Sequence, residues 1–246
     1  MYEEYPEMKQ ATTSPDGHIY SLHEVGKCYN CSRAMRFWVH DDFLKALNMS
    51  VPTTTEELYQ YLKAVKEQDV NGNGDPDDEV PLTGSTTGWF TQVYDFIMNA
   101  FTYKDENNLY LQEGTIHAAF AEEGWREGLR YLNKLYGEGL IDPTSFTNDD
   151  SQMTQIVELN EGNTVGAGPG GVQPGTNGPT RMKYKIVPPL KGPDGFQYAY
   201  FNEYGTVDVA KFILPANGKH KELVMKWVDF MYNKDVSNRA RYGTPG

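Results

Sequence analysis

The sequence predicts an α/β fold built on a mixed, mostly parallel sheet that is flanked by helices. Segments with helical periodicity alternate with short runs of β-branched and aromatic residues along the chain, which is typical of this class. The 246 residues are 39% hydrophobic and 23% charged, a balance that allows a core to be buried. That length is long for one domain and short for two full domains.

Short apolar runs bounded by turn residues predict the strands. Asp16-Gly17 is a turn signal that precedes the first of them. The predicted strands are residues 19–22, 35–39, 80–83, 164–168, 185–187 and 206–214.

Periodic apolar residues and capping residues predict the helices. Asp41 or Asp42 can cap a short helix. Thr54 and Glu57 have the spacing of a capping box, and the apolar stripe after them predicts a helix that ends near Gln68. Further helices are predicted along residues 90–101 and 125–136, and from Asn217 or Gly218 to residue 231.

The charge pattern argues against nucleic-acid binding, and the hydropathy pattern argues against a membrane-spanning segment. The formal net charge is −12 and no Lys/Arg-rich run is present, so no nucleic acid is expected to bind. No stretch approaches the roughly 20 apolar residues of a membrane span, so no transmembrane segment is expected. Residues 1–10 lack the basic start and apolar centre of a signal peptide, and the chain stops just after a helical pattern. We therefore interpret the chain as a fragment of a longer protein.

The two cysteines, Cys28 and Cys31, form a C-x-x-C motif. A structural zinc site needs a second pair of ligands, and the five histidines are scattered. A short-range disulfide or two idle thiols is therefore favoured over metal binding or redox chemistry.

An acidic loop at residues 69–79 is the sharpest local motif. Its first, third and fifth residues carry oxygen side chains and Gly74 is the sixth, as in calcium loops. Val80 stands where that pattern needs Glu, and a strand follows, so the loop is not a standard EF-hand; a solvated acidic turn is the alternative. We expect a structural Ca²⁺ held by Asp69, Asn71, Asn73, the carbonyl of Asp75, Asp78 and Glu79.

A polar loop at residues 84–88 leads to Trp89, which lies outside the helical stripe that begins at Phe90. A Trp at a helix N-terminus beside an α/β sheet can stack on a sugar ring, and packing in the core is the alternative. Residues 166–171 match G-x-G-x-x-G, but Pro174-Gly175 follows, so the helix that a dinucleotide site requires cannot start there.

Catalytic signals are weak. The chain has no G-x-S-x-G elbow, and no histidine has a partner at a recognisable spacing. Paired acids such as Asp41-Asp42 and Glu122-Glu123 are typical of the solvated surface of an acidic chain.

The order of these elements resembles family 1 of the bacterial extracellular solute-binding proteins, the maltose-binding-protein-like group. The likeness is greatest to the sugar-type lipoprotein receptors of Gram-positive gut bacteria. It is carried by residues 16–22, 37–44, 51–58 with their Pro-Thr-Thr entry, 69–84 and 125–143.

This resemblance implies a lobe like that of type II periplasmic-binding proteins, in a two-lobed protein that closes on its ligand. Residues 1–24 would form an interlobe crossing strand and entry, residues 25–200 the second lobe, and residues 201–246 the return strand and a first-lobe helix, with the first lobe largely missing. The resemblance also implies a carbohydrate ligand, ABC transporter permease subunits as partners of the full-length protein, and an extracellular, cell-surface lipoprotein form. The ligand-binding residues that it implies are Trp89, Phe90, Tyr29, Asn30, Gly170 and Gln173.

The leading prediction is therefore capture of an oligosaccharide-type ligand without catalysis. One alternative is a secreted calcium-containing carbohydrate-active enzyme domain, which needs two carboxylates roughly 5–10 Å apart across one pocket. Another is a structural or adhesion module that has no ligand-sized concavity.

Overall fold

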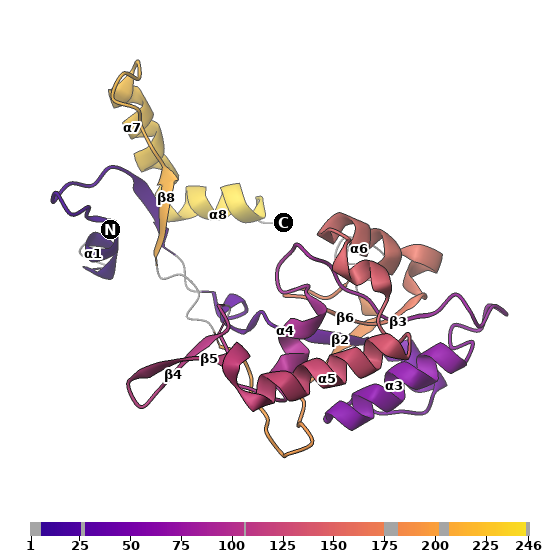
Figure 1. Cartoon of the computed structure of the whole chain (residues 1–246). Helices are drawn as coiled ribbons and strands as arrows, with labels where there is room; N and C mark the ends of the chain where they lie inside the picture. The colour runs from indigo at the N-terminus through magenta and orange to yellow at the C-terminus, as the bar shows by residue number, and fades with distance from the viewer. Residues whose placement is uncertain (1–5, 26–27, 106, 175–181, 202–206, 245–246) are drawn as a thin grey trace. The chain divides into compact units, whose positions relative to one another are not determined.

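The computed structural model describes residues 6–25, 28–105, 107–174, 182–201 and 207–244 (Figure 1). The chain divides into two compact units, Tyr29–Tyr204 and the pair of segments Met1–Cys28 and Gly205–Gly246. The larger unit holds most of the core and every predicted site residue, so it is described first.

The larger unit is built on a four-stranded sheet. Its strands lie in the order β3 (Val80–Leu82), β6 (Val165–Pro169), β2 (Phe37–His40) and β7 (Tyr184–Ile186). The prediction of a mixed sheet is confirmed, but the prediction that it is mostly parallel is wrong. Only β3 and β6 pair in parallel, because β2 lies between β6 and β7 and runs opposite to both. Alternation of helices and strands along a chain does not determine which strands become neighbours.

Among the described residues, the α-helices of the larger unit are α2 (Asp41–Ala46), α3 (Thr55–Glu67), α4 (Val93–Met98), α5 (Glu123–Gly137) and α6 (Asp150–Val157). The capping box at the start of α3 is confirmed, with the Glu57 N–H donating to Thr54 Oγ1 at 3.0 Å. The predicted cap of α2 is wrong, because the His40 side chain accepts the Phe43 N–H instead. Helix α4 begins at Val93, later than its apolar stripe, because Phe90 has φ +57° and cannot continue a helix.

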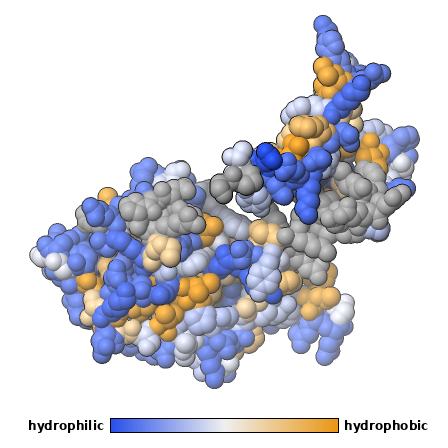
Figure 2. All heavy atoms as spheres, turned by 180° about the vertical axis from the view of Figure 1, so that it is seen from behind, coloured by the Kyte–Doolittle hydropathy of each residue, from blue (hydrophilic) through white to orange (hydrophobic). Residues whose placement is uncertain are grey.

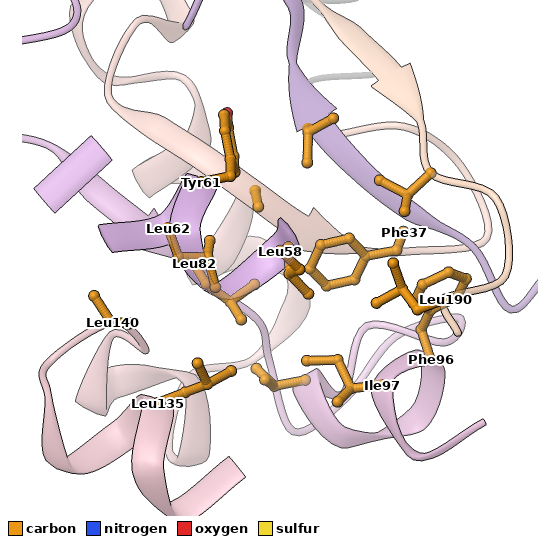
Figure 3. Packing of buried hydrophobic residues seen from close by; sticks show 14 of the residues in the cluster. Phe37, Leu58, Tyr61, Leu62, Leu82, Phe96, Ile97, Leu135, Leu140 and Leu190 are labelled. Carbon is orange, nitrogen blue, oxygen red and sulfur yellow. The ribbon is translucent and has the colours of Figure 1, made fainter. Parts of the chain in front are cut away.

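The core lies where α3 and α4 pack on the sheet (Figure 3). Phe37 and Phe96 stack with ring centroids 5.3 Å apart, and the Tyr61 hydroxyl donates to the Gly166 carbonyl at 2.9 Å. Other fully buried members of this core are Leu58, Leu62, Leu82, Ile97, Leu135 and Leu140. Helix α5 lies beside α3 and is joined to it by the Tyr131 hydroxyl, which donates to the Thr55 carbonyl at 2.6 Å.

A hairpin that the sequence patterns did not predict projects from the larger unit (Figure 1). It consists of β4 (Leu109–Gln112) and β5 (Thr115–Ala118). Its two-residue turn, Glu113-Gly114, has positive φ at both positions, as tight hairpin turns of this length require.

The smaller unit pairs β1 (Leu22–Val25) with β8 (Val207–Phe212) in an antiparallel ribbon. Its helices are α1 (Pro6–Thr12), α7 (Lys221–Met231) and α8 (Lys234–Tyr242). The strand predicted at residues 19–22 begins only at Leu22, and α7 starts after His220 rather than at Asn217 or Gly218. Apolar side chains reach the surface over α7 (Figure 2), among them Leu223, Trp227 and Phe230. Among the described residues, none of the helices has both the length and the hydropathy to cross a membrane.

Candidate functional site

Trp89 lies in the loop before α4, and the residue is 41% exposed. One side of its indole lies against Gly171, where a Cβ atom would collide with the ring. The Gly171 N–H also donates to the Trp89 carbonyl at 2.8 Å. Both loops therefore hold the indole in place while part of its surface stays open.

The backbone around Trp89 separates two neighbouring aromatic residues. Gly88 has φ +115° and Phe90 has φ +57°, so the chain turns sharply on each side of Trp89. Phe90 packs against the core, with its ring 5.7 Å from that of Tyr200. The two adjacent residues that the sequence proposed as ligand contacts thus have different surroundings.

Arg36 connects the loops that carry the other predicted site residues. Its guanidinium donates to the Gly171 carbonyl at 2.5 Å and to the Asn30 carbonyl at 2.6 Å. Burial lowers the pKa of Arg36, but the group keeps its charge because an arginine pKa starts far above neutrality. Two residues further along the chain, Trp38 Nε1 donates to the Gly170 carbonyl at 2.9 Å.

Arg36 and Trp38 were not among the predicted site residues. They occupy alternate positions of the predicted strand at residues 35–39, whereas Phe37 and Val39 belong to the core. Since alternate side chains of a strand point to opposite faces, this pattern could have assigned both residues to the face away from that core.

Tyr29 is 73% exposed and lies beside Arg33, whose guanidinium carbon is 4.2 Å from the Tyr29 ring centroid. The same guanidinium is 5.2 Å from the ring of Phe201, a half-exposed residue that the sequence did not single out. Gln173 is half-buried in the segment after Gly171, and residues 175–181 lie outside the described residues. The structure thus brings Trp89, Gly170 and the Tyr29-Asn30 segment together through Arg36.

The acidic loop folds around its own side chains between α3 and β3. Asp69 accepts the N–H groups of Gly72 and Gly74 at 2.7 and 2.8 Å, and Asp78 accepts the side-chain amides of Asn71 and Asn73 at 2.9 and 2.7 Å. Each asparagine oxygen accepts the backbone N–H two residues later, at 2.9 Å for Asn71 and 2.7 Å for Asn73. The side-chain oxygens of this loop therefore accept hydrogen bonds from the loop's own N–H groups.

Glu79 occupies a different place in this loop from the other acidic residues. One of its carboxylate oxygens accepts the N–H groups of Val70 and Asn71 at 2.8 and 3.1 Å. Its other oxygen is buried without a hydrogen-bond partner among the described residues, and burial raises the pKa of this carboxyl. A buried, unpartnered oxygen beside an acidic loop fits a cation ligand. In the part of the chain that the structure describes, this loop included, no three His, Cys, Asp or Glu side chains gather in a group that could hold a metal ion.

The remaining sequence motif, Cys28 and Cys31, is a disulfide. Of the two alternatives that the sequence left open, the short-range disulfide is therefore confirmed.

Comparison with known proteins gives the family. A model of the bacterial extracellular solute-binding proteins matches residues 27–237. The fructooligosaccharide ABC transporter substrate-binding protein FusA of Streptococcus pneumoniae is 28% identical over 99% of this chain, and the lipoprotein LipO of Bacillus subtilis is 24% identical over 99%. These matches cover 46% of FusA and 50% of LipO, so the chain spans about half the length of these relatives.

Solved structures agree with this assignment. The chain is similar to S. pneumoniae FusA in complex with kestose, with a TM-score of 0.85, 27% identity and coverage of 100% of this chain and 50% of that one. An EF-hand mutant of FusA in complex with fructo-nystose gives a TM-score of 0.87 and 26% identity, with the same coverage. The matching family consists of solute-binding proteins rather than enzymes. This agrees with the prediction from the sequence that the chain captures a ligand without catalysis. The chain therefore belongs to the bacterial extracellular solute-binding protein family.

Proposed function

We propose that this chain is part of an extracellular receptor that captures an oligosaccharide for an ABC importer without chemically changing it. The observation that carries the proposal is the open indole of Trp89, held by Gly171 and by the loops that Arg36 joins. An aromatic face with hydrogen-bonding groups around it binds the apolar face of a sugar ring while the hydroxyls find polar partners. The ligands in the names of FusA and its complexes are oligosaccharides, which supports this ligand class.

The two compact units fit the lobes that the resemblance implies. We propose that the larger unit is the second lobe, and that the ribbon of β1 and β8 with α7 belongs to the crossing segments and the first lobe. The exposed Leu223, Trp227 and Phe230 of α7 would then pack against the remainder of that lobe, since apolar side chains gathered on one helix favour a packing partner. A cell-surface lipoprotein form is supported by the name of LipO, and permease subunits would be the partners of the full-length protein.

We further propose that the acidic loop binds a structural Ca²⁺. Asp69, Asn71, Asn73, Asp78 and the Asp75 carbonyl would supply the oxygens of a hard-cation site, and Glu79 would close it from the buried side. The comparison with an EF-hand mutant of FusA supports such a loop in this part of the family. Calcium would join the end of α3 to the start of β3 and would take no part in ligand chemistry.

Thermal-shift and intrinsic-fluorescence titrations of the full-length protein test the proposed receptor function. The panel contains fructo-, malto- and galacturono-oligosaccharides. We expect at least one series to raise the melting temperature and to perturb Trp fluorescence, with no sugar consumed. Trp89→Ala should weaken that binding by about tenfold or more, since an aromatic contact beyond area burial contributes about 0.5–1.5 kcal/mol and the lost area adds to it.

A second variant addresses the position of the indole. Gly171→Ala places a methyl group where the Trp89 ring lies, so the ring must move and binding should weaken while Trp89 itself is retained. Tyr136→Ala, which alters an exposed aromatic residue on α5, serves as a control that should bind normally. Absence of any binding across the panel would overturn the receptor function, and consumption of a sugar would favour the enzyme alternative.

A further inference from the structure

A row of aromatic residues in two halves lies on the segments that Arg36 links to the Trp89 loops and on the unpredicted hairpin. Arg33 lies over the rings of Tyr29 and Phe201, and Tyr29 adjoins Asn30, whose carbonyl Arg36 holds. These residues form the near half of the row, which Arg36 links to the Trp89 site because it also binds the Gly171 carbonyl.

The far half of the row is built from the segment before Phe201 and from the hairpin. Tyr198 lies three residues before Phe201 in the chain, and its ring contacts that of Tyr103. The rings of Tyr103 and Tyr198 have centroids 4.0 Å apart, and that of Tyr110 on β4 is 5.7 Å from Tyr103. Tyr110 in turn stacks on its cross-strand neighbour His117 of β5, at 4.9 Å and 11° between planes. We call the four residues Tyr198, Tyr103, Tyr110 and His117 the hairpin row.

The chemistry of the hairpin row suits a sugar better than an aliphatic partner. Tyr103 is 43% exposed, and the other three side chains are half-buried. Each residue combines an apolar ring with a hydroxyl or an imidazole nitrogen, which is the combination that binds sugar rings. Glu122 adds a carboxylate, since the Tyr110 hydroxyl donates to it at 3.3 Å. The alternate positions of the same strands carry an aliphatic pair instead, the cross-strand neighbours Leu111 and Ile116.

We propose that the hairpin row is a distal subsite for the same oligosaccharide that stacks on Trp89, so that the receptor selects chains of several sugar units. This inference rests on the proposed function and adds to it the length of the ligand. In this arrangement the projecting hairpin extends the binding surface beyond the loops at the sheet. A mono- or disaccharide on Trp89 leaves the hairpin row uncovered, and a longer chain contacts both.

The test is isothermal titration calorimetry of the full-length protein with a di-, a tri-, a tetra- and a hexasaccharide of the best-binding series. In the wild-type protein the affinity should rise by about five- to tenfold or more from the shortest to the longest sugar, as expected for added aromatic contacts. The double variant Tyr103→Ala/Tyr110→Ala should lose this rise and bind the disaccharide unchanged. Ile116→Ala, on the other face of the hairpin and 72% exposed, should keep the rise.

The outcomes separate this inference from the proposed function. Equal affinity for short and long sugars in the wild-type protein overturns the distal subsite and leaves sugar capture intact. An unchanged length dependence in the double variant also overturns it, and so does an equal loss for all lengths, because the row would then only support the fold. If no sugar of any length binds, the proposed function itself fails.

Discussion

Arg36, which directly precedes β2, and Trp38 within it point away from the main core because they alternate with Phe37 and Val39. Each is held by backbone carbonyls of loops that lie far away in sequence, at Gly170 and Gly171. Every residue has a backbone carbonyl, so a contact with one leaves no pattern in the sequence. The sequence therefore shows that these residues face outward but does not show what they contact. The position of Trp89 depends on the same loop, since only a glycine at position 171 leaves room for the indole.

His40 shows how one buried side chain makes stability depend on pH. It is fully buried, its Nε2 lies 3.0 Å from the Gly162 carbonyl and its Nδ1 accepts the Phe43 N–H. Burial is the main cause that lowers its pKa, and Lys183 acts in the same direction; the Gly162 carbonyl, Asp42 and Asp41 oppose the shift. At the same pH, His40 therefore binds a proton less readily in the folded protein than in the unfolded chain.

The expected pH dependence follows from that difference. Above the ordinary value of 6.5 both states are neutral and the contribution of His40 is fully present; as pH falls below 6.5 toward the lowered pKa, the unfolded state gains protons and stability decreases. Urea unfolding between pH 7.5 and 5 measures this loss. His40→Gln keeps polar contacts without titrating in this range, and its stability should fall less over the same interval. Identical slopes for both proteins would contradict the assignment to His40.

Among the helices, α3 is the one whose start the sequence predicts in atomic detail. The Thr54 hydroxyl accepts the Glu57 N–H, and the Glu57 carboxylate returns to the Thr54 N–H at 3.3 Å and to the Thr53 N–H at 2.7 Å. A reciprocal cap of this kind depends on four consecutive residues, so local sequence is sufficient to define it. The hairpin of β4 and β5 is the contrasting element, because its turn, Glu113-Gly114, lacks the Asn or Asp that usually marks such turns.

The capping box should contribute measurably to the stability of the larger unit. Thr54→Ala removes the acceptor of the Glu57 N–H, and the free energy of unfolding should fall by about 1 kcal/mol. That corresponds to a decrease of roughly 2–4 °C in melting temperature for a chain of this size. The comparison is made by calorimetry of this variant and of Lys63→Ala, which substitutes a partly exposed residue on the same helix. A melting temperature equal to that of Lys63→Ala would show that the cap contributes nothing.

At the scale of the whole molecule, the acidic loop joins the main helix to the sheet. Since α3 and β3 both belong to the core, a cation that binds only the folded loop should stabilise the entire unit. With free Ca²⁺ at 100 times its dissociation constant, the gain is about 2.7 kcal/mol.

Removal of calcium with EDTA should therefore lower the melting temperature by roughly 5–10 °C. Re-addition of Ca²⁺ in excess of the chelator should restore it. Asp69→Ala, which removes the carboxylate at the first position of the loop, should melt at the lower temperature and ignore both treatments. An EDTA response that persists in this variant would place the cation elsewhere, and no response in the wild-type protein would refute the calcium site.

The sequence by itself determined the features that depend on neighbours along the chain. These are the α/β class, the positions of β2, β3, β6 and α3, the capping box, and the place of the acidic loop between a helix and a strand. The ordered set of motifs also indicated the solute-binding family, which the comparisons confirm. Period and capping are local properties, so a single sequence is enough to read them.

Only the tertiary structure decided which distant segments meet. The direction of β2 relative to β6 and β7, the binding of Arg36 to Gly171, and the contact of Tyr198 with Tyr103 beside the hairpin all join residues far apart in sequence. These contacts arise from packing of the core and from backbone groups that need hydrogen-bond partners wherever the chain brings them together. No local sequence pattern shows which distant segments meet, because these contacts depend on the fold as a whole.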